Sequence, residues 1–170
     1  NQTKLATIAL GDHVGPAYLR FGRPKWPIFT PENTKFQIGK GIKFLDGNDI
    51  SIFATGHMLW QALEAEKMLF SLGVSCEVIN IHTIKPLDEE IILESIKKTK
   101  CAISCEEHNI IGGLGESISR LISEKHPIPF KVIGVKDSFG ESGKPLDLLE
   151  KYNLNPESIK EAALEVINKK

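Results

Sequence analysis

The sequence predicts an α/β fold, a three-layer sandwich in which a mostly parallel sheet of about five strands lies between two layers of helices. Short apolar runs typical of buried strands, such as Ile50–Thr55, alternate with longer segments that have helical periodicity. This alternation is typical of βαβ units with right-handed crossovers. Such crossovers place helices on both faces of the sheet.

The N-terminal segment has a different pattern from the rest of the chain. Leu5–Leu10 has helical composition and stops at the turn signal Gly11-Asp12. Ala17–Leu19 then predicts a short strand that leads into Arg20. Prolines follow at positions 24, 27 and 31, and such a stretch is neither a helix interior nor a central strand. We therefore expect an extended linker and a domain boundary near Thr30, which divides the chain into residues 1–30 and 31–170.

The second part contains the segments from which the sheet and its helices are predicted. The expected strands are Gly41–Leu45, Ile50–Thr55, Val74–Ile81, Cys101–Cys105 and Phe130–Val135. The expected helices are His57–Leu72, Asp88–Lys100, a helix after Gly112-Gly113, Leu146–Lys151 and Pro156–Asn168.

End signals support two of these helices. Asp88 is a good N-cap, and Glu89 and Glu90 in the first turn complement the helix dipole. Lysines at positions 97, 98 and 100 stand at the opposite end, where cations are favourable. Gly73 stands where the C-cap of the preceding helix belongs.

Composition excludes several classes of function. Hydrophobic residues make up 41% of the chain and the formal net charge is −1, so no global attraction to nucleic acid or to an anionic membrane is expected. The apolar runs are too short to span a bilayer. The chain opens with Asn1-Gln2-Thr3-Lys4, without a leader or an initiator Met, so we expect a fragment or a trimmed product.

The three cysteines, Cys76, Cys101 and Cys105, do not form a disulfide pattern. Cys101 and Cys105 are four residues apart in a predicted strand and so share a face. A metal pair is one interpretation, but no matching Cys or His pair is evident, and buried core thiols fit better. A reducing, cytoplasmic setting follows.

Two segments at the ends of predicted strands contain residues that could bind an anion. Arg20 and Arg23 follow a predicted strand, where an arginine fork can hold a phosphate or carboxylate, or else pair with surface carboxylates. Glu106–Gly115 follows another strand, and its glycines could bring a helix N-terminus near an anion. It lacks the dinucleotide fingerprint, so a packing turn is the simpler interpretation, and a packing or interface role is simpler for His108.

The other loops that contain polar groups fit structural roles better than catalytic ones. They include His57, the pair His82 and Lys85, and the Gly140–Pro145 loop. The sequence contains no nucleophile elbow, no Walker loop and no His-rich metal cluster.

Taken in order, these segments resemble the C-terminal portion of transketolases. The element Leu19-Arg20-Phe21-Gly22-Arg23-Pro24 resembles the end of their pyrimidine-binding domain, and Phe36–Gly41 resembles the entry to their C-terminal domain. Further signatures are Thr83–Asp88, Glu106-Glu107-His108 with Gly112–Gly115, and Ser142–Pro145 followed by Leu148-Leu149. Each motif is weak alone, but together they cover nearly the whole chain.

The resemblance implies a function. Transketolases move a two-carbon ketol unit between sugar phosphates with thiamine diphosphate and a divalent cation such as Mg²⁺, at a site between the subunits of a homodimer. Their C-terminal domain supports the dimer and does not bind the cofactor directly. The implied partners of this chain are an N-terminal section, a sugar phosphate and a second copy.

One site residue follows from the same resemblance. The arginine that ends the last strand of the middle domain binds the substrate phosphate, and by position this is Arg20, with Arg23 as the nearer rival. No catalytic, cofactor-binding or metal-binding residue is assigned. Alone, the chain is expected to be inactive, with its first 30 residues less ordered than the rest.

Two alternatives remain. The C-terminal domains of 1-deoxyxylulose-5-phosphate synthases and of 2-oxo acid dehydrogenase beta subunits share this architecture, although the Glu106-Glu107-His108 and Ser142–Pro145 segments favour transketolase. The other alternative is a non-catalytic module that binds a nucleotide or another anion at the switch point of the sheet.

Overall fold

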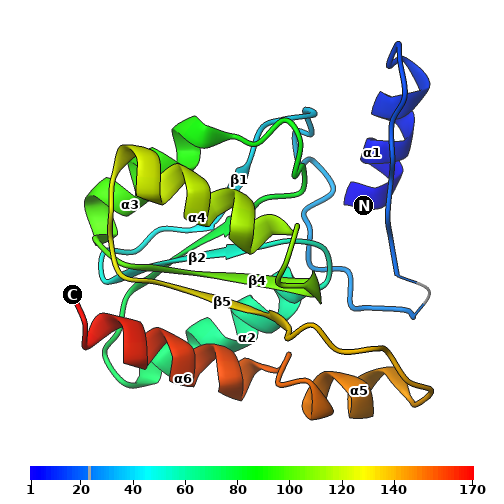
Figure 1. The fold of residues 1–170 in the computed structure, drawn as a ribbon. Coiled ribbons are helices and arrows are strands. Elements are labelled where there is room, and N and C mark those ends of the chain that lie inside the picture. The colour runs from blue at the N-terminus through cyan, green and yellow to red at the C-terminus, as the bar shows by residue number, and fades with distance from the viewer. Residues whose placement is uncertain (23) are drawn as a thin grey trace.

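The structure is a computed structural model that describes residues 1–22 and 24–170, and it has the predicted sandwich (Figure 1). Its five-stranded sheet has the order β1-β3-β2-β4-β5. The strands are β1 (Ile42–Leu45), β2 (Ile50–Ala54), β3 (Cys76–Asn80), β4 (Ala102–Asn109) and β5 (Phe130–Val135). The helices are α1 (Gln2–Gly11), α2 (Met58–Ser71), α3 (Glu89–Thr99), α4 (Leu114–Lys125), α5 (Pro145–Lys151) and α6 (Pro156–Ile167).

The sheet is parallel except at one edge, as predicted. Strand β2 pairs in parallel with β3 on one side and β4 on the other, and β5 extends the parallel set, whereas β1 pairs with β3 in the antiparallel sense. Strand β3 lies on one side of β2 and β4 lies on the other. The direction in which successive strands are added therefore reverses between β2 and β4, and their carboxyl ends mark the switch point of the sheet. This is the place where open α/β sheets bind ligands.

Helices cover both faces of the sheet, with α3 and α4 on one side and α2 and α6 on the other (Figure 1). Neighbouring residues of one strand point to opposite faces. Accordingly, Ile52 belongs to the core that includes Leu59 and Ala163 of α2 and α6. Phe53 belongs to the second core, with Ile92 of α3 and Ile118 of α4. Burial on both faces explains the uninterrupted apolar run of β2.

The predicted helix ends are confirmed. The Asp88 carboxylate accepts a hydrogen bond from the Ile91 amide at 3.5 Å, and Glu89 and Glu90 lie in the first turn of α3. Gly73 follows α2 with a φ of +82°, a conformation that favours glycine over residues with a Cβ.

The cysteines are free and buried, as expected for core thiols. Burial raises the pKa of Cys76 to about 12, so this thiol stays protonated at neutral pH.

Two sequence predictions need correction. Ala17–Leu19 is not a strand, since Ala17 and Tyr18 are exposed and, within the described chain, no ladder partner lies beside them. A strand without a neighbour leaves its amide and carbonyl groups unpaired. Strand β4 is longer than predicted and runs to Asn109, so Glu106 and Glu107 lie on the strand and not in the following loop.

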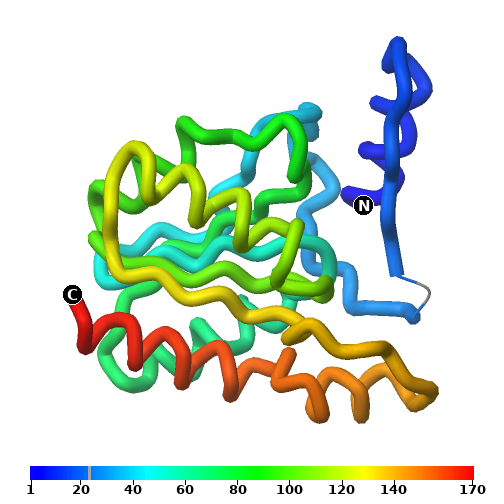
Figure 2. The backbone as a smooth tube through the Cα atoms, in the orientation of Figure 1, coloured from blue at the N-terminus to red at the C-terminus, as the bar shows by residue number. Residues whose placement is uncertain are grey.

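The N-terminal segment lies outside the sandwich. Helix α1 stands apart from the sheet, and the chain then returns along the carboxyl ends of the strands (Figure 2). Among the described residues, α1 has no extensive packing contact with another helix or strand. Single hydrogen bonds hold it, including one from Asn80 Nδ2 to Gln2 Oε1 at 2.9 Å.

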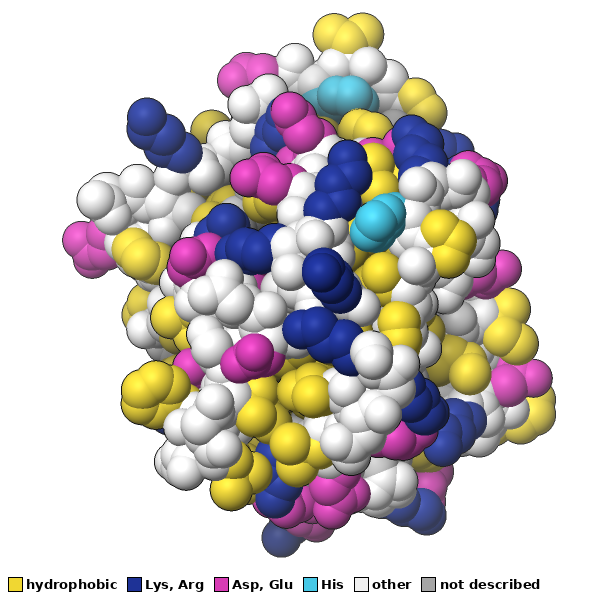
Figure 3. Space-filling model, turned by 90° about the vertical axis from the view of Figure 1, so that its left-hand side faces the viewer, with side chains coloured by type: hydrophobic (Ala, Val, Ile, Leu, Met, Phe, Trp, Pro, Cys, Tyr) yellow, Lys and Arg dark blue, Asp and Glu magenta, His cyan; other side chains and the backbone are white. Residues whose placement is uncertain are grey.

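Surface charge agrees with the nearly neutral composition. The face seen in Figure 3 carries lysine and arginine side chains interspersed with acidic and apolar ones. In the described structure, no helix is long and apolar enough to cross a membrane.

Candidate functional site

Arg20 lies at the carboxyl edge of the sheet, where the sequence predicts an anion-binding arginine. Its Nη1 donates a hydrogen bond to the backbone oxygen of Glu107 in β4 at 2.8 Å. Its Nη2 is 3.9 Å from Glu107 Oε2, and 55% of the Arg20 side chain is exposed. The guanidinium is therefore anchored on one edge and open to solvent on another. The rival Arg23 lies outside the described residues.

Glu107 and His57 form the centre of this site. His57 stands between β2 and α2, and its Nε2 is 2.6 Å from Glu107 Oε2. This hydrogen bond is the main reason why the pKa of the Glu107 carboxyl is lowered from its usual value, with further help from the charges of His57 and Arg20. Glu107 is consequently an anion at neutral pH.

Trp26 covers the histidine. The Trp26 and His57 rings stack with centroids 4.4 Å apart and planes inclined by 3°. His57 Nδ1 and Trp26 Nε1 are both buried and, in the described part of the chain, have no hydrogen-bond partner. Arg20 and Trp26 of the linker thus both lie against residues at the carboxyl ends of β2 and β4, at the switch point of the sheet.

The glycine-rich loop before α4 already binds a side chain of this chain, the carboxyl group of Glu106. Glu106 accepts hydrogen bonds from the amides of Leu114 at 2.7 Å and Gly115 at 2.8 Å. A Cβ at Gly113 would overlap this carboxyl group, which would then have to move away from the two amides. Burial raises the pKa of Glu106, although the two amide hydrogen bonds act in the opposite direction. The loop is therefore a packing turn, in agreement with the simpler interpretation of the sequence.

The other histidine loops also have structural contacts. The ring of His108 is exposed, and its Nδ1 is 2.7 Å from the Asn109 oxygen. His82 Nδ1 is 2.9 Å from Thr83 Oγ1, and the Phe36 ring lies against His82 at 4.4 Å between centroids. Burial lowers the pKa of His82, which favours a neutral ring. Among the described residues, neither histidine ring has a hydrogen bond or ion pair to Arg20 or to the Glu107 side chain.

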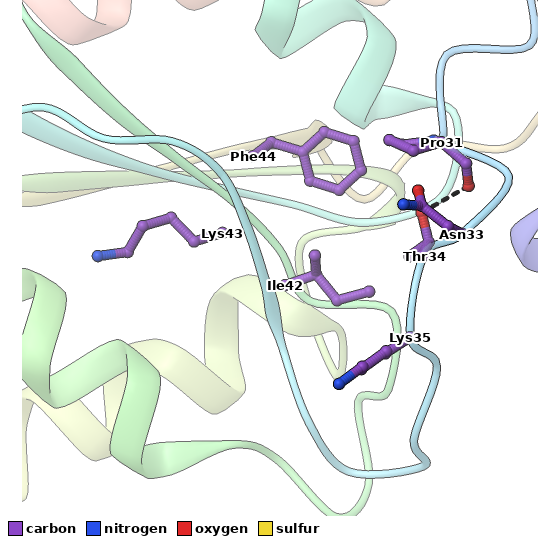
Figure 4. Close-up of a pocket in the computed structure, with 7 residues that line it drawn as sticks. All are labelled: Pro31, Asn33, Thr34, Lys35, Ile42, Lys43 and Phe44. Atoms are coloured by element: carbon purple, nitrogen blue, oxygen red, sulfur yellow. Dashed lines mark hydrogen bonds between the residues drawn. The ribbon is translucent and has the colours of Figure 1, made fainter.

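A shallow hollow of about 280 Å³ lies between the linker and β1 (Figure 4). Thr34 Oγ1 donates a hydrogen bond to the Pro31 oxygen at 2.7 Å beside it, and Ile42 and Phe44 line its inner wall. A second hollow of about 370 Å³ lies between Trp26 and the start of α5. Neither hollow is lined by Arg20, His57 or Glu107.

Metal ligands are not gathered anywhere in residues 1–22 and 24–170, where no group of three or more His, Cys, Asp or Glu side chains could hold an ion. The interpretation of Cys101 and Cys105 as half of a metal site therefore has no support from neighbouring side chains.

Comparison with known proteins identifies the family. Residues 39–159 match the model of the transketolase C-terminal domain. The chain belongs to this family. It is 40% identical over 158 residues to the 6-deoxy-6-sulfo-D-fructose transketolase subunit SqwH of a Clostridium species, covering 93% of this chain and 49% of that protein. It is 39% identical over 172 residues to a putative transketolase C-terminal section of Methanocaldococcus jannaschii, covering 98% of this chain and 53% of that protein.

A solved structure agrees with this family and with the fold. A protein described as a split gene transketolase, inactive beta4 tetramer, superimposes with a TM-score of 0.84 and 38% identity over 88% of this chain and 49% of that one. The chain spans about half the length of the curated relatives above. The resemblance drawn from the sequence motifs is confirmed at the level of the family.

Sequence reasoning located Arg20 but missed its neighbours. The local sequence predicts a turn residue at His57 and a loop position at Glu107. The signal that could have found them is topological. His57 follows β2 and Glu107 ends β4, and adjacent parallel strands bring residues at their carboxyl ends together.

Proposed function

We propose that this chain is the C-terminal section of a transketolase, which transfers a two-carbon ketol unit between sugar phosphates. Two features support the proposal. The chain is 40% identical to a protein named as a transketolase subunit, and it presents an exposed arginine at the switch point of its sheet. The proposed division of labour gives residues 1–30 to the middle domain and residues 31–170 to the C-terminal domain.

Arg20 is the residue that we propose to bind the phosphate of the sugar. Its bond to the Glu107 backbone oxygen uses one donor and leaves other donors of the planar fork open to solvent. A guanidinium with free donors suits a phosphate, which accepts two parallel hydrogen bonds. This placement is the observation on which the substrate assignment rests.

The proposed reaction requires thiamine diphosphate and Mg²⁺, but we assign no residue of this chain to bind them. The described residues provide no cluster of ligands for a divalent cation, so we assign none of them to the cofactor. When bound in the complete enzyme, thiamine diphosphate supplies the carbanion chemistry that carries the ketol unit. The contribution of this chain is to bind the sugar phosphate and to support the assembly, and we propose that the chain alone is inactive.

The proposed partners are an N-terminal section of the enzyme and a second copy of this chain, in the cytoplasm. The putative C-terminal section of M. jannaschii and the split gene transketolase support a two-part arrangement. Light scattering at high concentration tests the pairing of copies, since a strictly monomeric chain would count against it. A nucleotide-binding module is a weaker proposal because Glu106 already occupies the N-terminus of α4.

A transketolase assay tests the overall proposal. Xylulose 5-phosphate, ribose 5-phosphate, thiamine diphosphate and Mg²⁺ are supplied to this chain alone and to this chain mixed with its N-terminal section. We expect turnover only in the mixture. Turnover by the chain alone would contradict the proposed division of the enzyme, and silence of a folded mixture would favour another thiamine-dependent reaction.

The role of Arg20 has a separate test in the reconstituted enzyme. Arg20→Ala removes a charge-assisted contact and should weaken transition-state binding of phosphorylated donors by roughly 1.5–3 kcal/mol, with little effect on non-phosphorylated donors. Arg120→Ala is the matched control, because Arg120 is an exposed arginine on α4 that pairs with Glu124 at 2.9 Å. Equal losses for both kinds of donor would reject the assigned role.

A further inference from the structure

The surroundings of Arg20 assign a role to the sheet domain in substrate binding. We propose that Glu107 is a positioning residue that holds the Arg20 guanidinium in the orientation needed for the phosphate of the sugar. The inference rests on the proposed function of Arg20. It adds that β4, a strand of the C-terminal domain, contributes to the phosphate site by contacting the side of Arg20 that faces away from solvent.

The anchoring contact comes from the backbone of a strand. Arg20 Nη1 donates to the Glu107 carbonyl oxygen at 2.8 Å, and this oxygen cannot turn away because it belongs to β4. The Glu107 carboxylate stands on the same side, with Oε2 at 3.9 Å from Arg20 Nη2. Backbone and side chain of one residue therefore define the plane of the guanidinium, while its outer edge stays open.

The carboxylate does not collapse onto the arginine because another partner holds it. Glu107 Oε2 is 2.6 Å from His57 Nε2, which is much closer than its 3.9 Å distance from Arg20 Nη2. A tight salt bridge would occupy the donors that a phosphate needs. Because His57 binds the carboxylate, Glu107 attracts the guanidinium by charge and leaves its outer N–H donors free.

The linker is tied down at a second point nearby. Trp26 stacks on His57 at 4.4 Å between centroids, so the linker contacts the His57–Glu107 pair through both Arg20 and Trp26. The two contacts come from opposite ends of residues 20–26. Each contact keeps one end of this stretch of the linker close to the carboxyl ends of β2 and β4. The arrangement limits the freedom of an otherwise exposed and flexible side chain.

The same geometry has an opposite interpretation that experiment can separate. If Glu107 competed with phosphate for Arg20, removal of its charge would tighten the binding of phosphorylated donors. If Glu107 positions Arg20, removal of its charge would release the guanidinium and weaken that binding. The open edge of Arg20 and the engagement of the carboxylate by His57 favour positioning.

The test uses the reconstituted enzyme with Glu107→Gln, Arg20→Ala and the double variant, each with a phosphorylated and a non-phosphorylated ketol donor. Glu107→Gln should raise KM for the phosphorylated donor about 3- to 10-fold and leave kcat within about 2-fold. KM for the non-phosphorylated donor should not change. The double variant should be no worse than Arg20→Ala, because positioning has no effect without the arginine.

Two further variants keep the test decisive. His57→Phe preserves a ring against Trp26 but removes the hydrogen bond to Glu107, so it should shift KM in the same direction by a smaller factor. Glu124→Gln, in an exposed arginine–glutamate pair on α4, is the matched control and should change nothing. Unfolding midpoints check that each variant is folded.

The outcomes separate this inference from the proposed function. If Arg20→Ala affects both donors equally, the phosphate role fails and the inference fails with it. If Arg20→Ala is selective but Glu107→Gln is silent or lowers KM, only the inference is wrong. Additive losses in the double variant would also reject positioning.

Discussion

Residues 42–167 bury an apolar core on each face of a sheet, whereas the described part of residues 1–35 adds only Trp26 and Phe29 to the edge of one core and leaves several large apolar side chains exposed. The contrast is visible side chain by side chain. Phe53 of β2 is fully buried, while Val14, Tyr18 and Ile28 are 96%, 88% and 81% exposed. Apolar area removed from water stabilises the first region. The second region keeps comparable side chains in solvent.

The largest expected effect separates two phenylalanines. Phe53→Ala should lower the free energy of unfolding by about 3–5 kcal/mol, because it leaves a cavity in a packed core. Phe21→Ala, at a side chain that is 67% exposed, should change it by less than about 0.5 kcal/mol in the isolated chain. Urea unfolding of both variants measures the difference. Similar losses would mean that the N-terminal segment is part of the same cooperative core.

Substitution of two glycines, one in each region, should change the free energy of unfolding by an intermediate amount. Gly113→Ala should destabilise the chain by about 1–3 kcal/mol, because its Cβ would overlap the Glu106 carboxylate that caps α4. Gly11→Ala meets no neighbouring atom at the end of α1. Because alanine is the better helix former, we expect a change between zero and about 1 kcal/mol in the stabilising direction. Thermal unfolding compares the pair, and a loss at Gly11 would show packing around α1.

The smallest effect concerns the junction of the two regions, where Phe36 lies on His82. Burial lowers the pKa of His82 from its usual value of 6.5, so the unfolded chain binds the proton more readily. Stability from this residue is therefore present above pH 6.5 and is lost as the pH falls toward the lower pKa of the folded state.

Unfolding experiments between about pH 7.5 and pH 5 measure this dependence. His82→Gln should flatten the curve, whereas His13→Gln, at an exposed position after α1, should leave it unchanged. A curve that His82→Gln does not alter would assign the dependence to other groups.

The two regions also differ in how far the sequence predicted them. The apolar runs correctly predict β2 and its neighbours, because the strands that pair with them lie within the chain. Ala17–Leu19 was predicted as a strand from composition alone, but a strand needs a neighbour, which the described chain does not provide. Local pattern is a good guide only where the complementary surface is present.

Buried polar groups were beyond the reach of sequence patterns for a related reason. Glu77 is fully buried on β3, where its carboxylate is 2.6 Å from Lys43 Nζ and 2.8 Å from Lys98 Nζ. These partners come from β1 and α3, and only the folded sheet brings them together. The pair of His57 and Glu107 is the same case, with partners fifty positions apart in the chain. A family motif marks Arg20 in the sequence, whereas His57 and Glu107 have no local signature.

The most direct test of the two-region account is hydrogen exchange of the chain alone and mixed with its N-terminal section. We predict that amides of β2 are equally protected in both samples. Amides of Gln2–Gly11 should exchange quickly in the isolated chain and become protected in the mixture, since the exposed apolar side chains then find their partners. Protection of Gln2–Gly11 equal to that of β2 in the chain alone, or no gain in a mixture that forms a complex, would contradict the account.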